Sequence, residues 1–454
     1  MPFGIAALAA LLIALPLPGS TARSAPEPAM TTALPTEVFL ESIGVVSTFP
    51  DRGQPIEETI RMVRFGGFRW VRAGIEGLSE NGPTTLATLL RLHRETGVKF
   101  SWGLVSGGND LPRLLRTGRE LAGSDALLAF EGLNEPNNWP VTYQGETGGG
   151  QDRSWLPVAK LQRDLYTAVK ADPLLARYPV WTVSEPGAQT DNVGLQFLEI
   201  PPWASTPMPA GTRYADFANV HNYIYHPHSP EPADNKVWNA AAPGPEARVD
   251  GLYGNYGRTW RNWFTGYTQA RLDALPRVTT ETGAAITGTI TEEVHGRSLL
   301  TLYLAQFRRG YSYTSVYLLR DRTDEAGNQA FGFFRRDYSP RPAALYLHNL
   351  TTILADRGRI GRPGRLDYAI ANRPETVHEL LLQRRDGAFQ LVIWGERVRG
   401  ADHIAITFGQ ERPAVTIYDP TVGARPLRSL TKVRRVDLTL ANHPYVIEIA
   451  PRAR

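Results

Sequence analysis

The sequence of 454 residues contains no cysteine. This absence excludes disulfide bonds, thiolate metal ligands and a cysteine nucleophile. The chain also has no block of lysine and arginine typical of a nucleic-acid arm. Its formal net charge is only +4, and the basic run from Lys432 to Arg435 is short and contains a valine. We therefore expect no nucleic-acid partner.

Long apolar segments are scarce as well. One apolar run, residues 5–17, lies near the N-terminus and is too short to span a bilayer comfortably. Small residues follow it, which predicts a secretory signal peptide over residues 1–25. No lysine or arginine precedes the run, so an uncleaved anchor is the alternative. We expect a secreted or periplasmic protein that does not bind a membrane once the signal is removed.

Residues 26–40 begin with a stretch rich in proline, alanine and threonine, which predicts a flexible lead-in that could add an edge strand to a later domain. After it, short apolar runs alternate with amphipathic helical patterns over residues 41–358. The predicted strands cover residues 43–46, 68–72, 98–103, 126–130, 180–183, 217–223, 277–281 and 314–319. The predicted helices cover residues 56–65, 86–95, 111–121, 155–171, 260–275, 292–308 and 341–354.

Strand-then-helix units repeated in this way predict an α/β fold, specifically a (β/α)8 TIM barrel, although the fifth helix has the weakest pattern. An open doubly wound sheet is the alternative. It is disfavoured because no glycine-rich phosphate-binding turn follows the first strand. Residues 359–454 carry only strand patterns separated by turns such as Asp386-Gly387, which predicts a C-terminal all-β sandwich domain. Its predicted strands cover residues 379–383, 389–394, 404–408, 415–419, 436–440 and 445–449.

Two glutamates stand at predicted strand ends. Glu135 follows the fourth strand, where Pro136 ends the strand and a polar, glycine-rich loop follows over residues 142–151. Glu281 ends the seventh strand. In a closed barrel these two ends face each other across the mouth, where active sites are built. A lone Glu-Pro pair is more often a solvated loop carboxylate, so the distant partner is what favours catalysis.

Cleavage of a glycosidic bond needs such a pair: one carboxylic acid protonates the leaving oxygen, and a second group attacks the anomeric carbon or activates water. One carboxyl must hold a proton while the other is ionised, so their surroundings must differ. We expect Asn134 and Trp139 to supply a hydrogen bond and a partly dry wall near Glu135. Arg72, at the end of the second strand, would pair with Glu281 and keep it ionised.

Three further polar residues are interpreted from strand alternation. Tyr223, at the end of the sixth strand, would donate to the carboxylate of Glu281. His221 would share its face, although a packed barrel interior is an equally good interpretation of this histidine. Glu131 would point with Leu133 and Glu135 and serve as an interior partner for an arginine or histidine. Glu185, after the fifth strand, is a rival carboxylate.

The motifs Asn134-Glu135-Pro136, His221-x-Tyr223 and Thr280-Glu281-Thr282-Gly283, in this order and on these strands, resemble the large clan of retaining (β/α)8 glycoside hydrolases that includes cellulases, β-xylosidases and β-mannanases. Each motif alone is weak. The resemblance covers the barrel and implies that Glu135 is the acid/base and Glu281 the nucleophile. It also implies supporting roles for Arg72, Asn134, His221 and Tyr223. The trailing β-domain resembles that of the β-xylosidase-like families.

One departure concerns the end of the eighth strand, where the clan often has a tryptophan under the sugar ring. Here that place has Leu318-Leu319-Arg320-Asp321. Arg320 is a candidate contact for an acidic sugar, although an ion pair with Asp321 or Asp324 is the favoured interpretation. Because sugar rings stack on aromatic faces, we also expect tryptophans in the cleft. The candidates are Trp139 and, with weaker support, Trp102 and Trp238.

No cofactor and no metal are predicted, because the acidic stretch from Asp321 to Asn328 does not match the spacing of a calcium loop. The leading hypothesis is an exported retaining glycoside hydrolase that acts on a β-linked oligo- or polysaccharide. The alternatives are a non-catalytic carbohydrate-binding protein on a barrel scaffold and a transglycosylase that uses the same pair.

Overall fold

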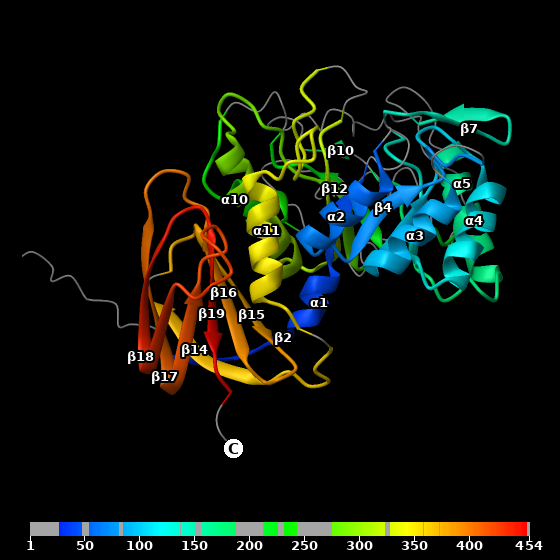
Figure 1. Ribbon diagram of the computed structural model, residues 1–454. Coiled ribbons are helices and arrows are strands. Elements are labelled where there is room, and N and C mark those ends of the chain that lie inside the picture. Colours follow the sequence, from blue (N-terminus) through cyan, green and yellow to red (C-terminus); the bar gives the residue numbers. More distant parts are fainter. Residues whose placement is uncertain are drawn as a thin grey trace, which may run out of the picture.

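The computed structural model describes residues 27–47, 54–80, 85–136, 138–149, 156–184, 186–187, 212–225, 231–242, 275–322, 327–356, 358–371 and 373–451. Two parts lie side by side, a barrel surrounded by helices and an all-β domain that ends the chain (Figure 1). The predicted signal peptide and all but the last residue of the predicted helix over residues 260–275 lie outside the described ranges. Within these ranges, no helix is both long and apolar enough to cross a lipid bilayer.

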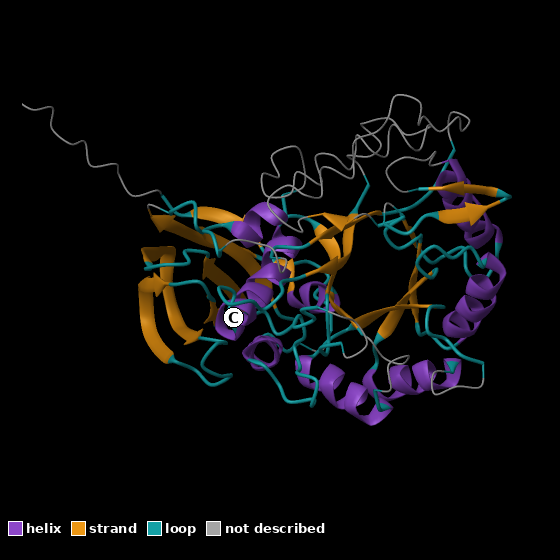
Figure 2. Cartoon of the chain, turned by 90° about the horizontal axis from the view of Figure 1, so that it is seen from above, coloured by secondary structure: helices purple, strands orange, loops and turns teal. Residues whose placement is uncertain are grey.

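The barrel consists of parallel strands that pair in the order of the sequence, and the last of them, β13, pairs with the first, β3. The strands are β3 (Ile43–Val46), β4 (Trp70–Gly74), β5 (Lys99–Gly103), β6 (Leu127–Glu131), β9 (Val180–Trp181), β11 (Ala218–Asn222), β12 (Arg277–Thr282) and β13 (Tyr311–Val316). A bridge between Trp181 and Phe217 connects β9 to β11, and the short β10 (Pro186–Gly187) adds to β11. The predicted eight-stranded parallel barrel is therefore confirmed as a nearly closed ring (Figure 2).

The helices that lie outside this ring are α2 (Ile56–Gly66), α3 (Leu86–Thr96), α4 (Leu111–Gly123), α5 (Leu156–Ala171), α10 (Glu292–Arg308) and α11 (Pro342–Ile353). Of these, α2, α3 and α4 each turn one apolar face toward the ring, whereas α10 is buried nearly all round. Polar side chains satisfy free backbone groups at two N-termini, where Asp110 accepts from the amide of Arg113 and Thr291 accepts from that of Val294. The helical predictions that fall on described residues agree with these bounds to within two residues.

The barrel interior is filled in layers. Its floor is aromatic: Trp70 and Trp181 pack edge to face with ring centroids 5.5 Å apart, and Tyr313 lies against both. Alternation along β4 then places Arg72 one layer above Trp70, and alternation along β6 places Glu131 above Ala129. The floor is thus dry and the next layer is charged, which puts the polar chemistry at the mouth of the barrel.

The all-β domain is a single hydrogen-bonded sheet. It contains β14 (Arg365–Ala371), β15 (Val377–Gln383), β16 (Phe389–Gly395), β17 (Asp402–Tyr418), β18 (Arg428–Leu440) and β19 (Pro444–Ile449). The long β17 pairs with β14 through its first half and with β19 through its second half. Side chains from both halves share one apolar core. The prediction of a sandwich is confirmed in part, because the domain is all-β but its two halves are continuous through β17 and β18.

The lead-in residues join the domains. The strands β1 (Ala29–Thr32) and β2 (Leu34–Pro35) pair with β14 and β15, and α1 (Thr36–Glu41) then leads to β3. The barrel helices α10 and α11 lie against the sheet (Figure 1). Arg308 on α10 donates to the carbonyl of Glu379, and Asn349 on α11 donates to the carbonyl of Pro420.

Two local predictions are wrong. The eighth strand ends at Val316 rather than residue 319, so Tyr317 is the residue that leaves the strand at the mouth. The expected loop over residues 142–151 contains a small hairpin, β7 (Val141–Tyr143) and β8 (Glu146–Gly148). The turn between these strands has Gln144 and Gly145 at positive φ, so two residues suffice for the reversal.

Candidate active site

Glu135 lies four residues beyond β6, on a backbone that has left the strand. Its φ is +43°, in the left-handed region that few non-glycine residues adopt. Its amide donates to Ser184 Oγ at 3.4 Å, and Asn138 Nδ2 donates to its carboxylate at 3.1 Å. Leu133 is buried in the hydrophobic core, so the expected alternation of Glu131, Leu133 and Glu135 is wrong beyond the end of the strand. The turn, rather than the strand, aims Glu135 at the mouth.

Glu281 extends from β12 and has two strong donors. The guanidinium of Arg72 contacts its Oε1, and Tyr223 donates to its Oε2 at 2.7 Å. Both contacts were predicted from the strand ends and are confirmed. Burial raises the pKa of Tyr223 well above its usual range, and the nearby Glu281 raises it further, so the hydroxyl keeps its proton and acts as a donor.

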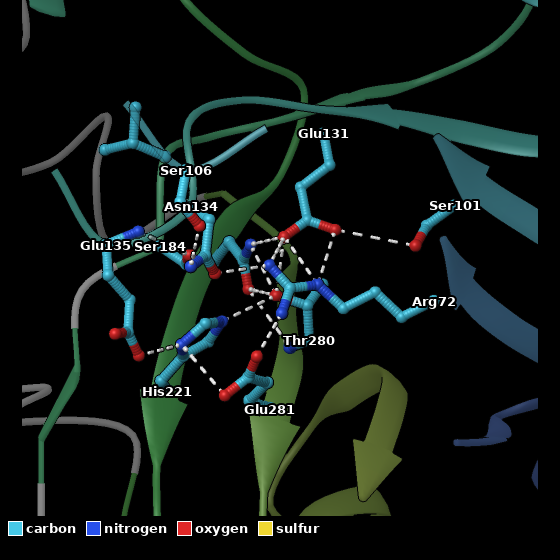
Figure 3. Close-up of polar contacts among 12 residues, drawn as sticks. Arg72, Ser101, Ser106, Glu131, Asn134, Glu135, Ser184, His221, Thr280 and Glu281 are labelled. Carbon is cyan, nitrogen blue, oxygen red and sulfur yellow. Dashed lines mark hydrogen bonds and ion pairs between the residues drawn. The ribbon is translucent and has the colours of Figure 1, made fainter. Parts of the chain in front are cut away.

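The two glutamates, called the carboxylate pair below, meet at the mouth of the barrel. Ligand atoms of Glu135, His221 and Glu281 all lie within 4.8 Å of one another, and both glutamate side chains are 14% exposed. In Figure 3, His221 stands between the two carboxylates. Its Nδ1 is 2.7 Å from Glu135 Oε1 and 3.7 Å from Glu281 Oε2. The sequence therefore identified two distant residues that the fold brings together, each reachable by solvent.

The pair has unequal surroundings. Burial raises the pKa of Glu135, against the opposing effects of the hydrogen bond from Asn138 and of Arg72. Burial also lowers the pKa of His221 to about 4. Glu281 instead has a direct cationic partner in Arg72. A carboxyl that tends to keep its proton thus faces a carboxylate paired with a cation, which is the division of labour that acid and nucleophile require.

Arg72 is the centre of this charged layer. Its Nε and Nη2 hold Glu131, the closest contact being 2.6 Å, and Nη2 also donates to Asn134 Oδ1 at 2.8 Å. Burial alone would lower the pKa of Arg72, but Glu131 and Glu281 together raise it, so the guanidinium stays charged. Glu131 is 1% exposed, and the prediction that it partners an interior arginine is confirmed.

Thr280 is a member of the site that alternation along β12 concealed. Val220 pairs with Thr279 and His221 pairs with Glu281, so Thr280 is an extra residue on β12. Such a bulge re-aims side chains. Thr280 Oγ1 donates to Glu131 Oε1 at 2.8 Å and lies 3.0 Å from His221 Nε2 (Figure 3). Consecutive residues on one strand therefore both face the interior.

Other polar members were also missed by sequence reasoning. They share a place in the hydrogen-bond network around the carboxylate pair, and they are Ser101, Ser106, Asn138, Ser184 and Asn219. Asn219 could have been found, because it lies two residues before His221 on β11, and Tyr223 follows at the same spacing just beyond the strand. The serines carry no comparable signal, since isolated serines occur throughout the chain.

Two predicted substrate contacts are wrong. Trp102 on β5 is fully buried on the outer face of the barrel, where its Nε1 donates to Thr117 on α4 at 2.9 Å. Trp238 lies on α7 (Lys236–Ala240) and stacks on His378 of the β-domain, with ring centroids 4.0 Å apart. The guanidinium of Arg309 lies over the same indole, 4.1 Å from the ring centroid. Both indoles are packing residues, one between strand and helix and one between the two domains.

Arg320 does not form the expected ion pair with Asp321. It is 4% exposed, its guanidinium lies 4.9 Å from the ring of Tyr338, and its Nη1 donates to the carbonyl of Arg336. Asp321 pairs instead with Arg341, at 2.7 Å. Asp324 and the rival carboxylate Glu185 lie outside the described residues. Arg320 is therefore a buried residue that packs on Tyr338.

The end of strand eight presents Tyr317 to the site. Its ring packs edge-on against Tyr223 and Phe331, with centroids 6.2 and 5.4 Å away. Its hydroxyl accepts from Arg322 at 3.2 Å. Because Tyr223 donates to Glu281, Tyr317 is one ring away from the carboxylate pair. The residue that follows strand eight is therefore the aromatic Tyr317. The predicted strand extended too far and so placed Leu318 and Leu319 there.

Trp139 is the exposed tryptophan that follows Glu135 in the described part of the chain. Its side chain is 53% exposed, and its amide donates to the carbonyl of Glu135 at 2.8 Å. The expected dry wall over Glu135 is therefore not provided by a buried indole. The exposed ring instead offers an aromatic face of the kind on which sugar rings stack.

Glu135, His221 and Glu281 are also the one group of metal-ligating type that the described part of the chain brings together. The surroundings do not suit a cation. Arg72 already binds Glu281 and Tyr223 occupies its second oxygen. A divalent ion would have to sit beside a buried guanidinium, whose charge repels it. The donor set therefore fits a proton-transfer site better than a metal site.

Comparison with known proteins gives the fold. No protein-family model matches the sequence, and no curated protein is detectably similar to it. Solved structures are similar in shape. A family 39 glycoside hydrolase from Bacteroides cellulosilyticus WH2 has a TM-score of 0.56 at 14% identity, over 92% of this chain and 82% of that one. CelM2, a bifunctional glucanase–xylanase from a metagenome library, has 0.58 at 10%, over 93% and 97%.

A third similar structure is the family 51 α-L-arabinofuranosidase from Thermotoga petrophila RKU-1, with a TM-score of 0.56 at 10% identity, over 94% of this chain and 98% of that one. Identities of this size establish a shared architecture and leave the chemistry to be argued from the site itself. The barrel with its C-terminal β-domain is therefore an arrangement that this chain shares with solved glycoside hydrolases over nearly its whole length.

Proposed function

We propose that the protein is a retaining glycoside hydrolase with Glu281 as nucleophile and Glu135 as acid/base. The observation that carries the proposal is the carboxylate pair, whose ligand atoms lie within 4.8 Å of one another and whose side chains are both partly exposed. Carboxyl groups about 5 Å apart suit direct attack on the anomeric carbon, whereas inversion needs a wider gap that admits water. The unequal surroundings of the pair support the same assignment.

The reaction follows from these positions. Glu281 attacks the anomeric carbon while Glu135 gives its proton to the leaving oxygen, so the glycosidic bond breaks and a glycosyl ester forms on Glu281. Glu135, now ionised, takes a proton from water. That water attacks the same carbon, and the carboxylate of Glu281 leaves. Two displacements restore the original anomeric configuration. Arg72 and Tyr223 hold Glu281 in place at both steps.

We further propose a β-linked oligo- or polysaccharide as substrate and an exported location, as expected from the sequence. One structural neighbour, CelM2, is a glucanase–xylanase, which supports the β-linkage. Another neighbour is an α-L-arabinofuranosidase, so furanosides with that linkage belong in the test. The carboxylate pair requires only that the nucleophile lie on the face opposite the leaving group, a condition that either substrate can meet.

The test is hydrolysis of a panel of aryl β-D-glycosides, aryl α-L-arabinofuranosides and β-linked polysaccharides, with proton NMR of the first sugar released. We expect release with retained anomeric configuration from at least one class. Inverted product would contradict the assignment of Glu281 as nucleophile. Binding of a glycan without release of sugar would favour the non-catalytic alternative, and transfer to added acceptor sugars in place of hydrolysis would favour a transglycosylase.

A second prediction concerns Trp139, which we assign to the leaving-group side because it follows the acid that protonates the leaving oxygen. Trp139→Ala should raise KM about tenfold for substrates whose leaving group is a sugar, since a stacked ring loses its partner. Aryl glycosides with the same glycone should change little. Val422→Ala, on another exposed apolar side chain, is the matched control. An equal fold-change in KM for both substrate types in Trp139→Ala would contradict the assignment.

A further inference from the structure

Thr280 connects the acid to the charged layer through His221. The imidazole of His221 is 0% exposed, with Nδ1 facing Glu135 at 2.7 Å and Nε2 facing Thr280 Oγ1 at 3.0 Å. A neutral imidazole has one donor nitrogen and one acceptor nitrogen. The direction of the contact with Thr280 therefore fixes the direction of the contact with Glu135.

The hydroxyl of Thr280 has one hydrogen and two acceptor sites. Its possible acceptors are Glu131 Oε1 at 2.8 Å, Asn219 Oδ1 at 3.1 Å and the ring nitrogen of His221. Asn219 Oδ1 already accepts from the backbone amide of Thr280. A bond to an ionised carboxylate is about twice as strong as a neutral one, so the hydrogen goes to Glu131.

Two donors then remain for the free electron pairs of Thr280 Oγ1. Asn219 Nδ2 donates to it from 2.9 Å, and the second position is filled by His221 Nε2. His221 therefore carries its hydrogen on Nε2 and presents a lone pair at Nδ1. The hydrogen in the 2.7 Å contact must come from Glu135, which is then a carboxylic acid.

We propose that Thr280 is a positioning residue that selects the Nε2–H tautomer of His221 and so keeps Glu135 protonated in the resting enzyme. This inference rests on the proposed function of Glu135 as the acid. Thr280 touches neither the reacting atoms nor the acid, and it acts through His221. No proton passes along the chain: Glu135 gives its proton to the leaving oxygen and regains one from water, while His221 keeps its hydrogen on Nε2.

The consequence reaches both steps of the reaction. In the resting state the lone pair of Nδ1 accepts from the acid, which favours protonated Glu135. After proton transfer the same lone pair faces a carboxylate, which makes ionised Glu135 a stronger base toward the incoming water. Other titratable or charged groups face this contact from the surrounding strands, and they are Arg72, Glu131, Tyr223 and Glu281. A change at Thr280 removes its hydrogen bond to Glu131 but leaves the contacts of Arg72, Tyr223 and Glu281 with one another in place.

The competing arrangement is an imidazolium whose Nδ1–H lies between Glu135 and Glu281. It would gain two carboxylate partners, at 2.7 and 3.7 Å. Against it stands the complete burial of the ring, which lowers the pKa of His221 to about 4 with the help of Arg72 and despite the opposing effects of Glu281 and Glu131. At neutral pH the ring is therefore uncharged, and the tautomer is the remaining choice.

The experiment compares Thr280→Val, which removes the hydroxyl at nearly constant shape, with Thr280→Ser, which restores it. Thr280→Val frees Nδ1 to carry the hydrogen, so ionised Glu135 becomes easier to form. One hydrogen bond corresponds to about one pH unit, so we expect the basic limb of the kcat/KM profile to move about one unit lower. At neutral pH, kcat/KM of Thr280→Val for alkyl glycosides should fall about tenfold. For dinitrophenyl glycosides, whose leaving group needs no proton, kcat/KM should change little.

Thr314→Val on β13 is the matched control. Thr314 is buried in the neighbouring strand, and its hydroxyl has no hydrogen-bond partner among the residues described. This variant should leave the pH profile unchanged, and Thr280→Ser should return the basic limb to its wild-type position. A Thr280→Val profile that does not move, or that moves equally in Thr314→Val, would overturn the proposal.

Nitrogen NMR of the full-length protein labelled with 15N-histidine provides a readout that needs no substrate. The chain has 9 histidines, and the signal missing from His221→Gln identifies the ring. We expect a proton on Nε2 and a bare Nδ1 in the wild type, and loss of that preference in Thr280→Val. A proton on Nδ1 in the wild type would overturn the inference even if glycosides are cleaved. If no glycoside is cleaved, the proposed function fails while the tautomer is still decided.

Discussion

Glu281→Ala should lose almost all hydrolysis, with kcat/KM for aryl glycosides lower by about 10⁴-fold or more, the order of loss seen when a nucleophile is removed. The reason is specific to this site. Without the carboxylate, no group replaces it at the anomeric carbon, and Arg72 and Tyr223 are left facing an empty volume. Glu135 still provides a proton, so departure of the leaving group is not what fails.

The cavity left by Glu281→Ala makes a sharper test possible. Azide fits the space, is attracted by the guanidinium of Arg72 and can attack from the same side as the lost carboxylate. We expect azide to restore turnover of an activated β-glycoside and to give the α-glycosyl azide, whose configuration is opposite to that of the substrate. The product is identified by NMR. Glu146→Ala, on the exposed hairpin β7–β8, is the control and should keep its activity and ignore azide.

The anomer of the glycosyl azide distinguishes the roles of the two glutamates. In Glu135→Ala, azide would enter on the opposite face and give the β-glycosyl azide, since the glycosyl ester on Glu281 forms first. Full activity of Glu281→Ala without azide would overturn the assignment of the nucleophile. The same azide anomer from both variants would overturn the division of labour between the carboxylate pair.

The barrel and the pair were predictable because each depends on a local pattern that the fold preserves. Apolar runs and amphipathic helices recur along the chain, and parallel strands bring their carboxyl ends to one mouth. Glu281, His221 and Tyr223 follow from that rule and from two-residue alternation. The contacts of Glu281 with Arg72 and Tyr223 follow from the register of the strands, and the two-residue alternation of side chains predicts them.

The errors arise where the backbone departs from a regular strand. A bulge at Thr280 turns two consecutive side chains inward, which alternation forbids. A left-handed residue at Glu135 breaks the pattern that began at Glu131. A strand that ends at Val316 moves Tyr317 to the mouth. None of these features has a distinctive residue type, because bulges and strand ends are decided by pairing with distant strands.

The tryptophans show a different limit. Trp102 and Trp139 have the same side chain, yet one is fully buried against Thr117 and the other is 53% exposed. Which of them can meet a sugar depends on which face of β5 carries a helix and on where a loop turns. Residue type indicates what an indole can do, and only the packing decides whether a ligand can reach it.

Arg72→Leu should cause the largest loss of stability among single changes in the site. Glu131 is 1% exposed and its carboxylate depends on this guanidinium for charge. Breaking a buried ion pair from one side costs about 3–5 kcal/mol, because the remaining charge stays buried without compensation. Urea denaturation should therefore show a much lower midpoint at neutral pH with an unchanged slope. Arg72→Lys keeps the charge but loses the forked geometry, so its urea midpoint should lie between those of the wild type and Arg72→Leu.

The loss of folding stability in Arg72→Leu should also depend on pH, and it should become larger as pH rises. In Arg72→Leu the folded state can relieve the buried charge by protonating a carboxyl that the unfolded chain leaves ionised at neutral pH. The folded state then binds more protons than the unfolded state, so stability falls as pH rises. The stability deficit should be small near about pH 4, where an unfolded glutamate is about half protonated, and should grow as pH rises until the folded carboxyl also ionises. A deficit that is constant over this range would mean that lost packing, rather than charge, is responsible.

The double variant Arg72→Leu/Glu131→Gln separates folding from catalysis. Removing both charges from the buried layer leaves no uncompensated ion there, so most of the lost stability and most of its pH dependence should return. Activity should stay low, because Glu281 lacks its cationic partner in either variant. If the double variant instead recovers activity together with stability, Arg72 serves only to neutralise Glu131. If it recovers neither, the layer is held by the geometry of the guanidinium and not by its charge.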